Sequence, residues 1–197
     1  MEKHVLGLEL PTDPRWVGIA EKNIGDILTD HAYCEQKAAT SCISLILQFF
    51  DKEAVVETLT PVVAEEWDHF ARVLKELKKR KLLLGPPHKD EYIEQLGKLI
   101  KKGGNREQQL VEKLLMNAMI EARSCERFRL LWKEINDEGL SNFYYELMVS
   151  EAGHYKIFLA LAKRYWNPQE VHHRWHELLT QEAEIMKRLQ VRGDRMH

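Results

Sequence analysis

The stretch SEAGHYKIF, residues 150–158, lies in the middle of a segment with one continuous apolar stripe. Alternating steps of three and four residues along it give Leu140, Tyr144, Leu147, Glu151, His154, Phe158, Leu161 and Tyr165. This spacing is that of one α-helix face, apolar except for a carboxylate and an imidazole at its centre. Burying an ionised carboxylate costs several kcal/mol unless it is paired or bound to a cation. The stretch therefore predicts a long core helix that carries a buried polar site.

Three further segments repeat this pattern of an apolar helical stripe interrupted by glutamate. Glu35 and Glu121 each interrupt one stripe, and Glu66 interrupts the third together with His69. Glu66 and His69 are three residues apart, the spacing of the first pair, which places both on one helix face about one turn apart. Buried glutamates at matching depth require a shared partner, and a metal ion is the simplest one.

The candidate metal ligands are four glutamates and two histidines: Glu35, Glu66, His69, Glu121, Glu151 and His154. Two Glu-x-x-His helices and two single-Glu helices are the ligand pattern of di-iron carboxylate proteins with a ferritin-like four-helix bundle. Carboxylate and imidazole ligands with open positions suit iron or manganese rather than structural zinc. The pattern therefore predicts two iron ions, with dioxygen as co-substrate.

Chance accounts for roughly one Glu-x-x-His match, given 23 Glu and 9 His in 197 residues. The chain contains three, and we interpret Glu170-x-x-His173 as the accidental one because it lies away from the centre of any stripe. Glu126 competes with Glu121 as a ligand, but it falls off the stripe and breaks the similarity of the two halves, whose paired glutamates are almost equally far apart in the sequence. The alternative to a metal is a buried salt-bridge network, which usually contains Arg or Lys, and these stripes contain neither.

Helical periodicity through nearly the whole chain predicts an all-α fold, a ferritin-like four-helix bundle with additional short and C-terminal helices. Caps and Pro or Gly signals predict helices over 13–50 (kinked near Gly25), 60–81, 90–102, 106–133, 141–166 and 168–190. The second could instead begin near Lys52, with Pro61 inside it. A short turn before residue 141 and a long crossover over 82–106 give the ferritin-like connections. Glu121 and Glu151 reach one level only if residues 134–139 unwind.

The composition predicts a single soluble, cytoplasmic domain over residues 1–197, with a basic, mobile tail from about residue 191. The formal net charge of -2 excludes a global field that would mark a nucleic-acid binder. Cys34, Cys42 and Cys125 are odd in number and lie in predicted helices, which argues against a disulfide framework. The longest apolar run, nine residues ending at Phe50, is too short to span a membrane. A monomer is favoured.

Some residues have both a structural and a functional interpretation. His31 lies one helical turn before Glu35 and could orient a ligand or relay a proton, although a hydrogen-bonded core histidine is the favoured interpretation. Tyr144 could line an oxygen pocket, but core packing is the default. Three basic clusters are either solvated faces or docking sites for RNA phosphates. They are Lys78 to Lys81, Lys98 to Arg106, and Lys187 to Arg195.

Four segments carry a resemblance to a known family: DHAYCEQKAATSC (30–42), EEWDHFARV (65–73), IEARSCERF (120–128) and SEAGHYKIF (150–158). The chain resembles the bacterial tRNA 2-methylthio-isopentenyladenosine hydroxylases, the MiaE family. The resemblance implies a non-haem di-iron monooxygenase that hydroxylates the isopentenyl side chain of the modified adenosine beside the anticodon of tRNA, with the six residues above as iron ligands and an external electron donor. Alternatives are a ferroxidase or peroxidase of the ferritin or rubrerythrin type, and a metal-free helical interaction protein.

Overall fold

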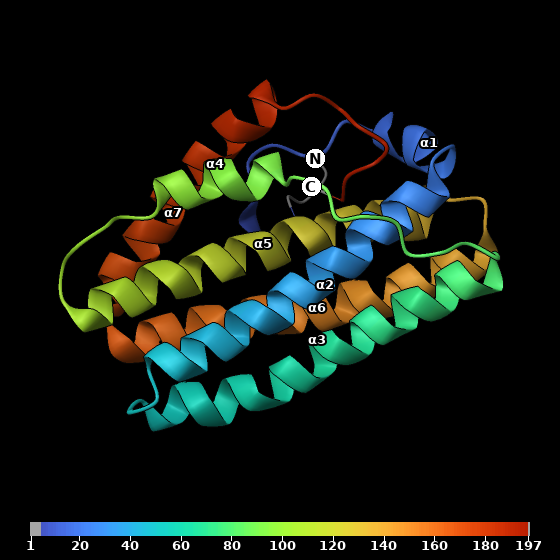
Figure 1. The fold of residues 1–197 in the computed structure, drawn as a ribbon. Coiled ribbons are helices and arrows are strands. Elements are labelled where there is room, and N and C mark those ends of the chain that lie inside the picture. Colours follow the sequence, from blue (N-terminus) through green and yellow to red (C-terminus); the bar gives the residue numbers. More distant parts are fainter. Residues whose placement is uncertain (1–4, 197) are drawn as a thin grey trace. The chain divides into compact units, whose positions relative to one another are not determined.

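The computed structural model describes residues 5–196, and within this range it contains helices and connecting segments but no strand (Figure 1). The predicted all-α fold is confirmed. The elements of this range are a 3-10 helix, η1 (Val5–Gly7), and seven α-helices: α1 (Trp16–Glu21), α2 (Ile24–Gln48), α3 (Glu53–Lys79), α4 (Glu91–Leu99), α5 (Arg106–Glu134), α6 (Glu138–Tyr165) and α7 (Pro168–Arg188).

The described residues form two compact units. Unit 1 contains η1 and α4 to α7, in residues 5–14 and 90–191, and unit 2 contains α1 to α3, in residues 15–89 and 192–196. Each unit has one hairpin of two long helices that lie side by side, α5 with α6 in unit 1 and α2 with α3 in unit 2 (Figure 1). The single domain over residues 1–197 stays a prediction.

The helix predicted over residues 13–50 is two helices in the structure, α1 and α2. The chain leaves the helical conformation at Asn23, whose φ is -129°, so the interruption falls before Gly25. The Asn23 side-chain amide donates a hydrogen bond to the Ile19 carbonyl oxygen at 2.8 Å and stabilises the end of α1. The predicted start at residue 13 is also wrong. The first helical residue is the fully buried Trp16, so packing rather than the Asp-Pro signal marks the start.

The second long helix, α3, begins at Glu53, so the start predicted at Thr60 is wrong and the alternative start near Lys52 is confirmed. The Thr60 hydroxyl donates to the Val56 carbonyl oxygen at 2.6 Å, one turn back, instead of capping a new helix. Pro61 lies inside α3, where proline removes a helical hydrogen bond. Local sequence signals were outweighed here by the packing of the hairpin.

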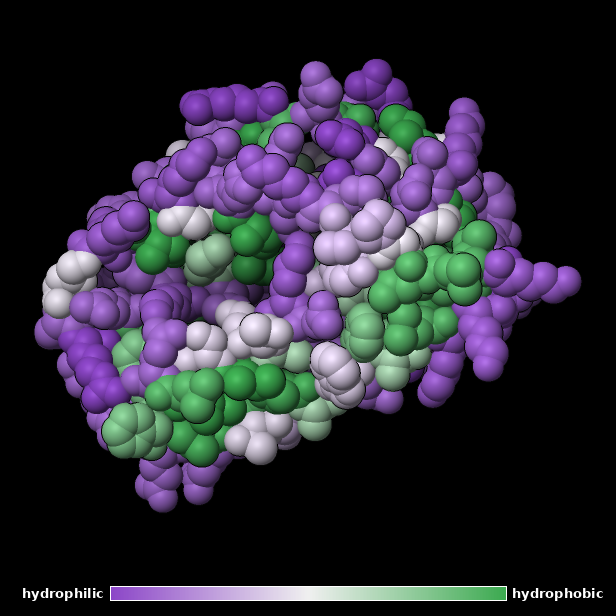
Figure 2. Space-filling model, in the orientation of Figure 1, coloured by the Kyte–Doolittle hydropathy of each residue, from purple (hydrophilic) through white to green (hydrophobic). Residues whose placement is uncertain are grey.

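At its other end, α3 stops at Lys79, close to the end predicted at residue 81 and before Gly85-Pro86-Pro87. Lys81 adopts a left-handed conformation with a φ of 57°, and the Leu82 N–H donates to the Leu77 carbonyl oxygen at 3.0 Å. This is the hydrogen bond of a Schellman motif. The next residues are exposed, Leu83 to 90%, and Figure 2 shows hydrophobic surface at this end of α3.

Polar caps define the hairpin of unit 1. Asn105 and Gln108 form a capping box at the start of α5, close to where the sequence predicts it. Asp137 caps α6 by accepting a hydrogen bond from the Leu140 N–H at 2.9 Å. The helix predicted from Ser141 therefore begins at Glu138, and the turn between α5 and α6 is only residues 135–137.

The two shorter segments of unit 1 are close to prediction. The short helix predicted over 90–102 is α4, and Asp90 caps it by accepting from the Ile93 N–H at 3.1 Å. The helix predicted over 168–190 is α7, with Asn167 as its cap and Pro168 at its first position. Proline is tolerated there because the first N–H groups of a helix have no helical partner.

Residues 192–196 pack within unit 2. The backbone N–H of the buried Met196 donates to Asp30 Oδ2 at 2.7 Å. A Cβ atom on Gly193 would lie 2.5 Å from the Ile19 side chain, so the segment needs glycine for this close approach. The mobility of the tail from about residue 191 stays a prediction.

The remaining expectations concern cysteines and membranes. Cys34, Cys42 and Cys125 are all free thiols. None of the helices formed by residues 5–196 combines the length and hydrophobicity that a membrane span requires.

Candidate metal centre

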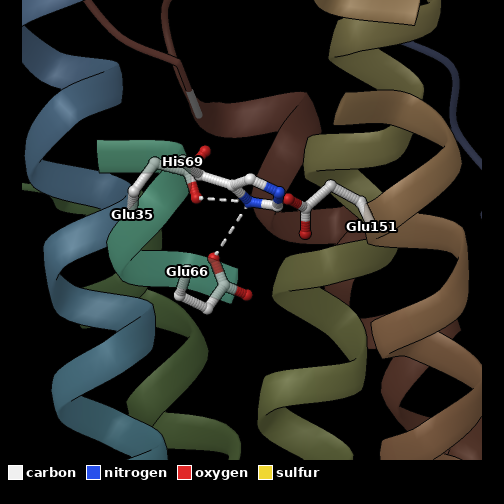
Figure 3. Close-up of side chains that lie close together, drawn as sticks. All are labelled: Glu35, Glu66, His69 and Glu151. Atoms are coloured by element: carbon white, nitrogen blue, oxygen red, sulfur yellow. Dashed lines mark ion pairs between the residues drawn. The ribbon is translucent and has the colours of Figure 1, made fainter. Parts of the chain in front are cut away.

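The hairpin of unit 2 brings together the three predicted ligands that it carries. Glu35, Glu66 and His69, which we call the unit 2 half-site, are buried and offer ligand atoms within 4.8 Å of one another. His69 Nδ1 lies 3.5 Å from Glu35 Oε2 and 3.5 Å from Glu66 Oε2 (Figure 3). A metal cation can bind between this imidazole and the two carboxylates, since side chains of both types are metal ligands in proteins.

The positions of these side chains along the hairpin axis follow from the lengths of the helices. Glu35 lies as far before Gln48, the last residue of α2, as Glu66 lies after Glu53, the first residue of α3. At a helical rise of about 1.5 Å per residue, both glutamates are about 20 Å from the turn. Equal distances from a turn place residues of an antiparallel hairpin at the same level.

The hairpin of unit 1 repeats this arrangement. Glu121, Glu151 and His154, which we call the unit 1 half-site, are buried and also offer ligand atoms within 4.8 Å of one another. His154 Nδ1 lies 3.7 Å from Glu151 Oε2. Each half-site thus contains one single glutamate and one Glu-x-x-His pair.

The level of the unit 1 glutamates corrects the sequence interpretation. Glu121 lies as far before Glu134, the last residue of α5, as Glu151 lies after Glu138, the first residue of α6. Unwinding of residues 134–139 is therefore not required, because only 135–137 lie outside the helices. The paired glutamates are slightly closer in sequence in unit 1 than in unit 2, because the turn 135–137 is shorter than the turn 49–52.

In unit 1, three buried carboxylates outside the half-site have arginine partners. Arg123 donates three hydrogen bonds of 2.7 to 3.0 Å to Glu182 and one of 3.1 Å to Glu126. In the same unit, Arg174 donates to both oxygens of Glu112, at 2.7 and 2.9 Å. These pairs neutralise their charges within the protein, whereas Glu35, Glu66 and Glu151 of the half-sites lie beside imidazoles. The half-sites have the oxygen and nitrogen donors that iron accepts, so the cluster is compatible with iron.

The Arg123 network also settles the place of Glu126, the competitor of Glu121. Both Glu126 oxygens accept hydrogen bonds from Thr12, from its backbone N–H at 2.9 Å and its hydroxyl at 2.5 Å. Glu126 therefore holds the segment before α1 against α5, while Glu121 belongs to the half-site. The sequence interpretation missed the role of Arg123, although three charged residues around Cys125 in a buried stretch were the available signal.

The third Glu-x-x-His match lies outside both half-sites. Glu170 and His173 are exposed in the first turns of α7, and His173 pairs with Glu177 at 3.1 Å. A surface cavity of about 610 Å³ is lined by all three, together with Gly103 and Gly104 of the loop between α4 and α5.

Two further residues singled out in the sequence lie in the core of unit 1. Burial, with the nearby Glu151 as the next cause, raises the pKa of the Cys125 thiol to about 12. The thiol is therefore protonated at neutral pH and is a poor metal ligand. Tyr144 is fully buried, and its ring packs 5.4 Å from that of Phe128.

His31 is fully buried next to the unit 2 half-site. Its Nε2 atom lies 2.6 Å from Glu35 Oε1, while the other oxygen of Glu35 faces His69. Glu35 thus lies between two imidazoles. The hydrogen bond between His31 and Glu35 is compatible with a histidine that orients a ligand and with a hydrogen-bonded core histidine.

Two antiparallel helical hairpins with matched glutamate and Glu-x-x-His sets define a class, the helical carboxylate–histidine metalloproteins. The family model described as tRNA-(MS[2]IO[6]A)-hydroxylase (MiaE) matches residues 2–197. The chain therefore belongs to the MiaE family, and the predicted family and enzyme class, a tRNA hydroxylase, are confirmed.

Individual relatives agree with the family. The chain is 35% identical over 164 residues to the tRNA 2-(methylsulfanyl)-N(6)-isopentenyladenosine(37) hydroxylase of Pseudomonas putida, covering 83% of this chain and 78% of the relative. It is 28% identical to the Salmonella typhimurium protein of the same name, covering 80% and 75%. Among solved structures it is similar to protein 43 with aldehyde deformylating oxygenase activity from Synechococcus, with a TM-score of 0.90, 31% identity, and 96% and 94% coverage. This likeness confirms the predicted ferritin-like fold class.

Proposed function

We propose that this chain is a di-iron monooxygenase that hydroxylates the isopentenyl side chain of 2-methylthio-isopentenyladenosine beside the anticodon of tRNA. The observation that carries the proposal is the pair of matched half-sites on a chain of the MiaE family. Dioxygen is the co-substrate, an external donor supplies electrons, and the enzyme acts in the cytoplasm as a monomer.

Two iron ions bind to the chain, one at each half-site. The six ligands are Glu35, Glu66, His69, Glu121, Glu151 and His154. Each half-site offers two carboxylates and one imidazole, which leaves coordination positions open for substrates. Iron supplies the redox chemistry that activates dioxygen when it is bound.

The reaction converts one C–H bond of the isopentenyl group into C–OH. One oxygen atom of dioxygen enters the product, and the other leaves as water. The balance requires two electrons and two protons for each hydroxylation, and these come from the external donor and solvent. An apolar surrounding protects the oxidising step from water.

Apolar residues of both hairpins provide that surrounding. Leu147 and Phe158 lie one turn before and one turn after the Glu151 pair on α6 and are fully buried. Val62 and Val73 flank the Glu66 pair on α3 in the same way. These side chains exclude water and hold the carboxylates and imidazoles in fixed positions.

Two measurements test the proposal. Protein loaded anaerobically with ferrous iron is expected to contain two iron ions per chain. With tRNA that carries 2-methylthio-isopentenyladenosine, reductant and dioxygen, nucleoside analysis is expected to show the hydroxylated nucleoside. Iron-loaded protein that leaves the nucleoside unchanged would contradict the hydroxylase and leave a ferroxidase or peroxidase, and protein that takes up no iron would favour the metal-free alternative.

The likeness to the Synechococcus protein favours a second candidate function, an oxygenase that acts on aldehydes. The same iron-loaded protein can be assayed with aldehydes as substrates. We expect no turnover of aldehydes, because the relatives that share the family are tRNA hydroxylases. Turnover of aldehyde without turnover of tRNA would favour the aldehyde oxygenase over the tRNA hydroxylase.

A further inference from the structure

The two half-sites differ in the residue one helical turn before the single glutamate. Before Glu35 this residue is His31, whose Nε2 atom is 2.6 Å from Glu35 Oε1. Before Glu121 it is Asn117, whose amide nitrogen donates to the Lys113 carbonyl oxygen of the preceding turn at 2.8 Å. The matched ligand sets therefore have an imidazole at this position in one unit and a shorter amide in the other.

The contact with His31 fixes one oxygen of the Glu35 carboxylate. An ionised carboxylate only accepts hydrogen bonds, so the His31 Nε2 atom must carry the hydrogen when Glu35 is charged. The bond leaves Glu35 Oε2 directed to His69, 3.5 Å away. Fixing one oxygen by a donor thus orients the other oxygen toward the position of a metal ion.

We propose that His31 is a positioning residue for Glu35, and that it makes the unit 2 half-site the tighter of two inequivalent metal sites. This inference rests on the proposed function, because it concerns the metal ions of that centre. His31 lowers the entropy that Glu35 loses when it binds a cation. Hydrogen-bonding partners of metal ligands contribute about 10–100-fold to metal affinity.

The test is a titration of metal-free, full-length protein with Co²⁺, followed by its optical absorption. Every variant carries His172→Ala and His176→Ala, because these exposed imidazoles lie one turn apart, with ring centroids 4.4 Å from each other, and would chelate Co²⁺. The protein with His31 intact is expected to bind two ions in two separate phases.

His31→Leu removes the N–H donor and puts an apolar side chain of similar size in its place. The dissociation constant of the tighter phase is expected to rise by about 10–100-fold, with a changed absorption spectrum, while the weaker phase stays within about threefold. His31→Gln places an amide N–H near the position of Nε2 and is expected to restore tight binding. Asn117→Leu is the matched control in unit 1 and is expected to leave the tighter phase unchanged.

Each result has one interpretation. Two phases with unchanged constants in His31→Leu would overturn the role of His31 while leaving the di-iron centre intact. Equal losses in His31→Leu and His31→Gln would also overturn it, since the donor would not be the cause. If His31→Leu does not fold, as judged by circular dichroism, His31→Asn, whose amide is too short to reach Glu35, is compared with His31→Gln. Failure of the parent protein to bind any metal would instead contradict the proposed function.

Discussion

The hairpins of the two units resemble each other in their candidate metal ligands and differ in the residues that surround them. In both, the two glutamates lie equally far from the turn, and in both a histidine follows the second glutamate by one helical turn. The levels of the ligands are thus determined by helix length alone. Helix length does not determine which side chains surround the glutamates, and these side chains differ between the two units.

The difference lies in how buried charge is neutralised. Unit 1 buries Arg123, Arg127 and Arg174, and burial lowers the pKa of Arg127 to about 10. Unit 2 buries no arginine or lysine among residues 15–89 and 192–196, and its half-site carboxylates contact imidazoles. A similar ligand set can therefore be supported either next to an arginine network or next to a histidine.

The largest expected effect comes from removing one ligand in each unit. Glu66→Ala and Glu151→Ala are each expected to lose iron and at least about 100-fold of the hydroxylase activity, more than the loss of an outer partner causes. Helix content by circular dichroism should stay nearly unchanged, because the apolar residues that hold each hairpin together are all retained. Full iron loading in either variant would remove that residue from the ligand set and break the equivalence of the half-sites.

The next largest effect concerns the arginine network of unit 1. Arg123→Met leaves Glu182 and Glu126 buried without this cation and is expected to lower the free energy of unfolding by about 3–5 kcal/mol, measured by urea denaturation. The double variant Arg123→Met with Glu182→Leu should recover part of this loss, because both buried charges are then removed. No recovery would show that the pair does not act as a unit.

A smaller effect is expected from charge reversal in the basic run at the end of α3, Lys78 to Lys81, which we propose as a docking site for tRNA phosphates. Lys78 and Lys81 are exposed beside the hydrophobic surface at the end of α3, whereas Lys79 and Arg80 pair with Glu76. Lys78→Glu with Lys81→Glu is expected to weaken tRNA binding about tenfold and to lower the dependence of the logarithm of affinity on the logarithm of salt concentration by about 2.

The matched control for this prediction lies in unit 1. Lys187→Glu with Arg188→Glu makes the same change of charge on α7, where Lys187 already pairs with Glu184. This variant is expected to bind tRNA with nearly unchanged affinity. Equal losses for both pairs would mean that net charge, rather than the basic run at the end of α3, determines binding.

The smallest effect is on helix stability. Pro61→Ala restores a helical N–H inside α3 and is expected to raise the free energy of unfolding by about 1–2 kcal/mol. Pro168→Ala, at the first position of α7, should give no gain because proline is tolerated there. Thermal melting of both variants checks the difference, and an equal gain would show that position in the helix does not matter.

The errors of the sequence interpretation have a common physical cause. Thr60-Pro61 and Ser141 predict helix starts because caps and proline are local signals. In the structure, Thr60 bonds backward to Val56, and Asp137 caps α6 one turn before Ser141. Helix ends respond to small free-energy differences that packing easily outweighs, whereas long periodic stripes are supported by many buried residues.

The sequence by itself determined the all-α fold, the family and the residues that make up the two half-sites, because apolar periodicity and Glu-x-x-His spacing are properties of the chain alone. The tertiary structure decided the common level of the glutamates, the contact of His31 with Glu35, and the assignment of Glu126 to the Arg123 network. These depend on where helices end and on which segments pack together. Arg123, for example, bonds to both Thr12 and Glu182, which are far from it in the sequence, and no local pattern specifies these contacts.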